Sequence, residues 1–151
     1  MEINKLLELD HDFVSSTSNV TISFMLQNIN KGEFILNQLN EKEIPLEVTI
    51  YKILKGLPIH IVSAITFTDG KPIWNIVKGN DELKNIIKWI NEDISINILG
   101  KTVSFKYFND EDKKNLLEND RFVISTLIGS LNLKSDDLSS NDLIEIARLC
   151  F

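Results

Sequence analysis

The chain has 151 residues, of which 43% are hydrophobic and 25% are charged. This composition is that of an ordinary globular protein and excludes a disordered chain, and the length suits a single domain, 1–151, with one core. The formal net charge of −6 repels phosphate backbones, so we expect a basic protein as partner and no nucleic acid.

The start of the sequence and its longest apolar stretch lack the patterns of exported or membrane proteins. An acid, Glu2, stands where a signal peptide has its basic region. The uncharged apolar run 56–68 is shorter than the roughly 20 residues of a spanning helix. A single cysteine, Cys150, cannot form an internal disulfide. We therefore expect a cytoplasmic protein without a membrane partner, and the preference for lysine over arginine favours a bacterial or phage origin.

The pattern of apolar residues predicts an α+β fold. The expected architecture is an antiparallel sheet of about five or six strands with one face covered by helices, and with further helices at the C-terminus.

The N-terminal third contains several short apolar patterns. Residues 15–19 are rich in serine and predict a loop. A strand is predicted next, because apolar and polar residues alternate at Val20, Ile22, Phe24 and Leu26. Residues 33–40 fit a short helix or a returning strand, and both remain open. The alternation of Leu46, Val48 and Ile50 predicts another strand.

The pair Asp69-Gly70 predicts a tight hairpin, since both central residues of a type I′ turn need positive φ. The register then pairs Thr68 with Lys71, Phe67 with Pro72, Ile65 with Trp74 and Ser63 with Ile76. One face becomes the expected core, with Ile61, Ile65, Phe67, Trp74 and Ile76. The more polar face carries His60, Thr66, Thr68, Lys71 and Asn75. Trp74 should therefore be more buried than Trp89, which lies at the edge of a helix stripe.

The next segment combines a helix and a second hairpin. Asn80 is a suitable N-cap, and an apolar stripe follows at helical spacing: Leu83, Ile86, Ile87 and Ile90. A Gly100-Lys101 turn of type II′ would then pair Ile98 with Val103, Ile96 with Phe105 and Ile94 with Tyr107.

The C-terminal third is predicted to be helical. Asn109 or Asp110 is the expected N-cap of a helical region. Its apolar stripe consists of Leu116, Leu117, Val123, Ile124, Leu127 and Leu131. If the region forms two helices, we expect the break near Asn119-Asp120. A last helix is predicted from the stripe Leu143, Ile146, Ala147 and Cys150.

Catalytic signatures are missing from the sequence, so we do not expect an enzyme, a cofactor or a metal. No glycine-rich nucleotide pattern, GxSxG or HExxH occurs. The acidic run 109–112 lacks the glycine and the glutamate of a calcium loop. An enzyme or ligand-binding domain would have to assemble its site around His60, with Tyr51 or Tyr107.

The distribution of acids suggests where a partner binds. Acids outnumber bases in the C-terminal third, and the candidate partner-binding residues are Asp110, Glu111, Asp112, Glu118 and Asp120. Complementary charge speeds association and rejects wrong partners. The expected function is that of an inhibitor or immunity-type protein that neutralises a basic protein. The alternatives are a secretion or assembly chaperone that forms a homodimer, and the enzyme built around His60.

Overall fold

The computed structural model describes residues 14–36, 43–92, 94–128, 144–145 and 147–148. The strands are β1 (Val14–Thr21), β2 (Phe34–Leu36), β3 (Ile59–Thr68), β4 (Lys71–Lys78), β5 (Ile96–Ile98), β6 (Lys101–Val103) and β7 (Asp120–Ile128). The helices are α2 (Ile22–Asn30), α3 (Leu46–Leu54), α4 (Asn80–Asn91) and α5 (Asp110–Glu118), with a short 3₁₀ helix η1 (Phe105–Tyr107). The predicted α+β class is confirmed. Within the described residues, no helix has the length and apolar content needed to cross a bilayer.

The main sheet has five strands in the order β1-β7-β3-β4-β2. The pairs β1/β7 and β3/β4 are antiparallel, whereas β7/β3 and β4/β2 are parallel. The sheet is therefore mixed, and the strand directions differ from the antiparallel arrangement that we predicted. Strands β5 and β6 form a separate two-stranded sheet.

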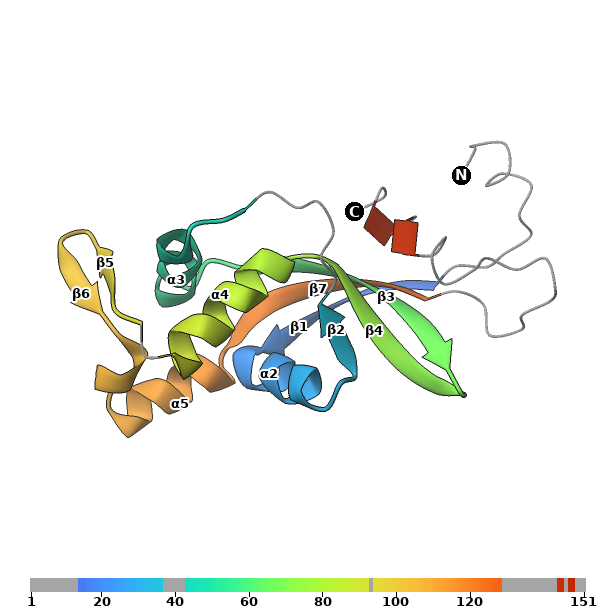
Figure 1. Cartoon of the computed structure of the whole chain (residues 1–151), viewed down its shortest axis with the longest axis horizontal. Helices are drawn as coiled ribbons and strands as arrows, with labels where there is room; N and C mark the ends of the chain where they lie inside the picture. The colour runs from blue at the N-terminus through green and yellow to red at the C-terminus, as the bar shows by residue number, and fades with distance from the viewer. Residues whose placement is uncertain (1–13, 37–42, 93, 129–143, 146, 149–151) are drawn as a thin grey trace.

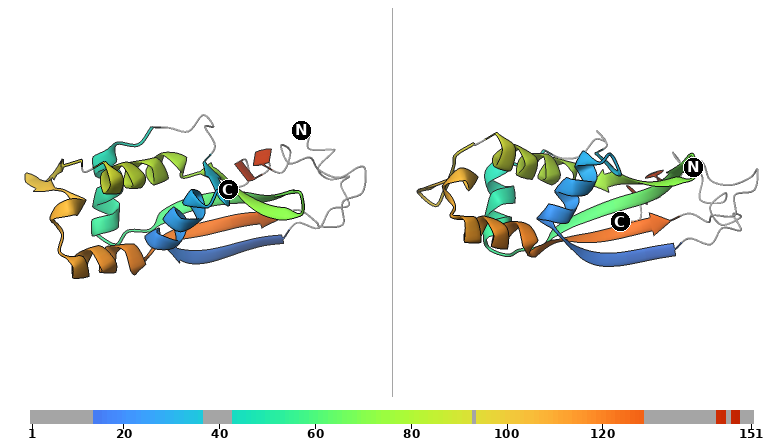
Figure 2. Two further views of the ribbon diagram at one scale, coloured as in Figure 1. Left: turned by 60° about the horizontal axis from the view of Figure 1, so that its bottom comes forward. Right: turned by 90° about the horizontal axis from the view of Figure 1, so that it is seen from below.

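The helices α2 to α5 gather over one face of the main sheet, toward one end of it (Figures 1 and 2). Together with that face they form the main core, which includes Ile22, Met25, Ile50, Ile53, Ile61, Leu83, Ile86, Trp89, Phe122 and Ile124. The opposite face is not simply polar, because a second apolar cluster lies on it: Val62, Ala64, Val77, Leu127 and Ala147. The prediction of a sheet with one wet face is therefore correct only in part.

The first hairpin and the helix that follows it are confirmed. Asp69 and Gly70 have φ of 52° and 76°, and Thr68 pairs with Lys71, as predicted. The pairs Ile65 with Trp74 and Ser63 with Ile76 also match the prediction. Helix α4 has the predicted position, although Gly79 and not Asn80 is its N-cap residue.

The N-terminal third differs from the prediction. Residues 15–19 belong to strand β1 and are not a loop, and the expected strand from Val20 is mostly helix α2. Thr21 caps this helix, because its hydroxyl accepts a hydrogen bond of 3.0 Å from the N–H of Phe24. In the segment 33–40, the described part contains the short strand β2.

The expected strand at Leu46, Val48 and Ile50 is helix α3. A spacing of two and a spacing of three to four both fit this short segment. The helix buries Thr49, Ile50 and Ile53, so the helical period decided the structure.

The second hairpin turns one residue earlier than predicted. Its central residues are Leu99 and Gly100, so Ile98 pairs with Lys101 and Ile96 pairs with Val103. The predicted partner of Ile96, Phe105, instead begins η1. There Phe105 and Phe108 contact the ring of Trp89, with centroid distances of 5.4 and 5.8 Å. Packing of aromatic rings against α4 therefore ends the hairpin.

The predicted helical region after residue 109 is a helix only as far as Glu118. Asn109 caps α5 as predicted, since its side chain accepts a hydrogen bond from the N–H of Asp112. The residues from Asp120 onward form β7, in which Phe122 and Ile124 face the main core. Of the stripe predicted for the last helix, Ala147 is described and buried. Leu131, Leu143, Ile146 and Cys150 lie outside the described residues.

The burial of the two tryptophans is the reverse of our prediction. Trp89 is completely buried, whereas Trp74 is half-buried, because it lines a hollow on the sheet face. We now predict that Trp89→Ala lowers the free energy of unfolding by about 3–5 kcal/mol, and that Trp74→Ala lowers it by less. Urea denaturation measures both values. A larger loss of unfolding free energy for Trp74→Ala would show that Trp74, and not Trp89, belongs to the main core.

Gly79 lies where the chain passes close to β3. A Cβ at this position would overlap Cδ1 of Ile61 and lie 3.1 Å from the carbonyl oxygen of His60, while at Gly70 nothing lies within 4 Å. Both glycines have positive φ. We predict that Gly70→Ala costs about 1–2 kcal/mol from the backbone conformation alone, and that Gly79→Ala costs about 1–3 kcal/mol more from overpacking. Equal midpoints in thermal denaturation would contradict the close approach.

Candidate functional site

Helix α3 exposes apolar side chains that the core does not use. Ile50 and Ile53 are completely buried, whereas Val48 is 43% exposed and Tyr51 37%. The helix is fixed to α4 by the side chain of Asn85, whose Nδ2 donates to Oγ1 of Thr49 over 2.9 Å. The exposed side chains are therefore held on a rigid element.

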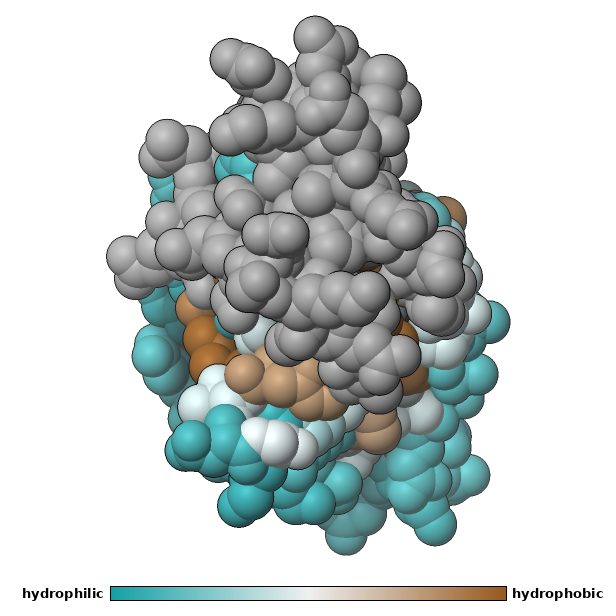
Figure 3. Space-filling view, turned by 90° about the vertical axis from the view of Figure 1, so that its right-hand side faces the viewer, coloured by the Kyte–Doolittle hydropathy of each residue, from teal (hydrophilic) through white to brown (hydrophobic). Residues whose placement is uncertain are grey.

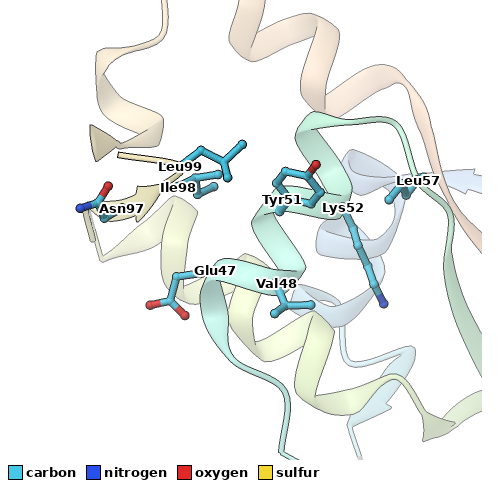
Figure 4. A pocket seen from close by; sticks show the side chains of 8 residues that line it. All are labelled: Glu47, Val48, Tyr51, Lys52, Leu57, Asn97, Ile98 and Leu99. Carbon is cyan, nitrogen blue, oxygen red and sulfur yellow. The ribbon is translucent and has the colours of Figure 1, made fainter. Parts of the chain in front are cut away.

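A pocket of about 390 Å³ lies between α3 and the β5–β6 hairpin. In Figure 4, Ile98 and Leu99 on the hairpin side lie opposite Tyr51 and Val48 on the helix. Leu57 extends the apolar surface beyond the end of α3. The arrangement can receive a large apolar group from outside the molecule.

Leu99 is the most exposed of these apolar residues. Its side chain is 83% exposed, and its φ of 50° places the backbone in the left-handed region. A leucine there is strained, since glycine, asparagine and aspartate are the residues that adopt this conformation easily. Strain of this kind concentrates at functional sites. Burial in the folded chain does not account for Leu99.

The rim of the pocket is polar, with Glu47, Lys52 and Asn97. The ammonium group of Lys52 lies 3.6 Å from the carboxylate of Glu82, so its charge is paired with α4. The carboxylate of Glu47 is exposed at the edge of the pocket. The rim therefore favours a positive group beside the apolar one.

The five candidate acids are all exposed, but the structure divides them. Asp110, Glu111 and Asp112 form the first turn of α5. This turn follows η1 at the end of the molecule that also carries α3 and the β5–β6 hairpin (Figures 1 and 2). Glu118 and Asp120 lie at the other end of α5, about 12 Å along its axis. Only the first three are placed near the pocket's end of the molecule.

The residues of the enzyme hypothesis lie on different elements. His60 is exposed on β3 and does not line the pocket beside α3. Tyr51 lines the pocket beside α3, and Tyr107 lies 76% exposed on η1. Among the described residues, no group of three or more His, Cys, Asp or Glu could hold a metal ion.

Of the pocket residues, sequence reasoning named Tyr51 as a site candidate and missed the others. Val48 was placed on a strand, and Leu99 was placed before the turn and not in it. Two signals were present in the sequence. Helix α3 has more apolar residues than one buried stripe needs, and a leucine precedes Gly100 where a tight turn favours asparagine or aspartate.

Comparison with known proteins gives no relative. No protein-family model, no curated protein and no solved structure matches the chain. The case for a function therefore depends on the geometry of the site.

The strain at Leu99 has a measurable consequence. We predict that Leu99→Asn stabilises the fold by about 1 kcal/mol, since asparagine adopts the left-handed conformation more easily and Asn-Gly suits the turn. Leu99→Ala is the control, because it shortens the exposed side chain without relieving the backbone. Thermal denaturation of the two variants gives the comparison. If Leu99→Asn is no more stable than Leu99→Ala, Leu99 is not strained.

Proposed function

We propose that the chain is a protein-binding domain of the inhibitor or immunity type, which holds a basic protein partner at the end of the molecule formed by α3, the β5–β6 hairpin and the start of α5. The observation that carries this proposal is the apolar pocket beside α3, with the strained and exposed Leu99 at its edge.

A protein suits this surface better than a small molecule. Exposed apolar side chains continue from Leu57 of the pocket, which is 47% exposed, to Leu54 outside its lining, which is 37% exposed. A small ligand would leave these side chains in water, whereas a partner's surface would cover them. Contiguous apolar surface of this kind typically marks protein contacts, in which a few large side chains enter pockets and supply most of the binding energy.

The charges favour a basic partner. The chain carries a net charge of −6, and the exposed carboxylates nearest to this end include Glu47 and the first turn of α5. A positive surface is drawn toward such a region before contact, and this attraction raises the rate of association. The binding energy itself would come from the apolar contact.

Inhibition follows from occlusion. A domain of 17.3 kDa that covers the functional surface of another protein prevents access to it. The chaperone-like alternative would use another part of the molecule, the edge of the main sheet at β1. The enzyme alternative is less well supported, because the pocket beside α3 contains Tyr51 but neither His60 nor Tyr107.

The test begins with a partner recovered from the native host, whose binding kinetics and activity are then measured. We predict that the triple variant Asp110→Asn, Glu111→Gln, Asp112→Asn slows association several-fold at low salt and much less at high salt, because screening removes the attraction. The matched control, Glu33→Gln, Asp69→Asn, Glu92→Gln, changes the net charge by the same amount with exposed acids elsewhere, and should slow association less.

The apolar contact is tested separately on the same partner. Leu99→Asn should speed dissociation at least about tenfold, while Phe67→Ser, which removes a 39% exposed apolar side chain from β3, should leave it unchanged. Inhibition of the partner's activity should weaken in parallel. An acidic partner, or equal dissociation rates for the two variants, would contradict the proposal.

A further inference from the structure

Strand β1 is the first strand in the order of the main sheet and lies at its edge. Its eight residues pair with β7 on one side, and within the described part of the chain no strand pairs with the other side. In an antiparallel pair, alternate residues direct their backbone N–H and C=O groups away from the neighbouring strand. The sequence of β1, VSSTSNVT, has no charge and no proline. Edge strands that avoid pairing with other chains usually carry charged residues or proline, so β1 lacks this common protection against pairing.

A hollow of about 320 Å³ lies on the sheet face beside this edge. Ser16 and Ser18 line it from β1, the strand at this edge, and their side chains are small. Ile124 and Ile128 of β7 and Ile65 of β3 also line it, and Trp74 lies on the side away from β1. Figure 3, which views the molecule from the right-hand side of Figure 1, shows apolar side chains at the surface.

The hollow is uncharged and is lined partly by aromatic rings. None of its lining residues is acidic or basic. The ring of Phe34 lies 5.4 Å from that of Trp74 and 5.8 Å from that of Phe24, edge to face in both pairs. Such a wall receives large apolar side chains.

We propose that β1 binds an extended segment of another protein as a sixth strand of the main sheet, with large apolar side chains at alternate positions that enter the hollow over Ser16 and Ser18. Neighbouring strands are about 4.8 Å apart, so β7 lies about 9.6 Å from the added strand. A leucine or phenylalanine bridges much of that distance only where the residue between is small. The backbone of β1 supplies the hydrogen bonds, and the hollow selects segments in which large apolar side chains alternate with other residues.

Charge and shape favour a foreign segment over a second copy of this chain. A second β1 would place serines opposite serines and leave the hollow empty. Two chains with a net charge of −6 each also repel one another. The same charge favours basic residues on the side of the segment that faces solvent. This surface is separate from the pocket beside α3, so the inference does not depend on the proposed function.

The test uses three synthetic peptides of one composition. The first alternates leucine and threonine between terminal lysines, the second groups its leucines in one block, and the third is the alternating peptide with every second backbone nitrogen methylated. Binding is followed by fluorescence, since Trp74 lines the hollow while Trp89 is fully buried. We expect the alternating peptide to bind at least about tenfold more tightly than the other two.

Two variants of neighbouring residues distinguish binding in the hollow from nonspecific hydrophobic binding. Ser18→Phe fills the hollow from β1 and should lower the affinity for the alternating peptide at least about tenfold. Thr17→Phe adds the same ring at the next residue, on the opposite face of the strand, and should leave binding unchanged. The Leu99→Asn variant should also bind normally, so failure of the proposed function would not affect this result.

Two outcomes would overturn the inference. One is equal affinity for the alternating and methylated peptides, which would mean that no backbone ladder forms. The other is a dimer in sedimentation that Ser18→Phe dissociates, which would mean that a second copy of the chain occupies the edge.

Discussion

The structure depends on the burial of strand β3 from both sides. β3 lies between β7 and β4, and five successive residues, from Ile61 to Ile65, are buried. Ile61 faces the main core and Ala64 the second cluster. The one hydroxyl in this stretch, that of Ser63, is satisfied by Thr126 of β7 over 3.0 Å. A strand of this kind reads as a continuous apolar run because neither side meets water. The close approach at Gly79 then fixes α4 against it.

The sequence predicted the elements whose local signals agree with one another. Asp69-Gly70 has the right residues for a type I′ turn, and the flanking strands place apolar side chains in register with it. Helix α4 has acids in its first turn and one apolar stripe. Each of these segments satisfies its turn or cap chemistry and its periodicity at the same time, so one solution is favoured.

Elsewhere the signals conflict, and contacts distant in sequence decide. Leu46, Val48 and Ile50 fit both periods, and the helix is chosen because it buries Ile50 and Ile53 under α4. β1 has few apolar residues and forms only because β7 supplies a partner along its whole length. Register in the second hairpin is set by Phe105 and Phe108, which pack on Trp89. No window of a few residues contains this information. The candidate surface beside α3 was missed for the same reason, since its members become neighbours only after α3 and β5 meet.

The two binding surfaces would select partners by different physics. At the pocket beside α3, side chains would make the contacts, and recognition would depend on the shape and charge of the group that enters. At the edge of β1 the backbone supplies the hydrogen bonds, which are common to every extended chain, so selectivity rests on the hollow behind Ser16 and Ser18. The first surface is suited to one folded partner, because a wrong shape leaves Leu99 and its neighbours exposed. The second would accept any segment with large apolar side chains at alternate positions, because the serines leave room for several such side chains. If both proposals hold, the chain would bind a folded domain at one end and an extended segment along the edge, and the two partners would not compete.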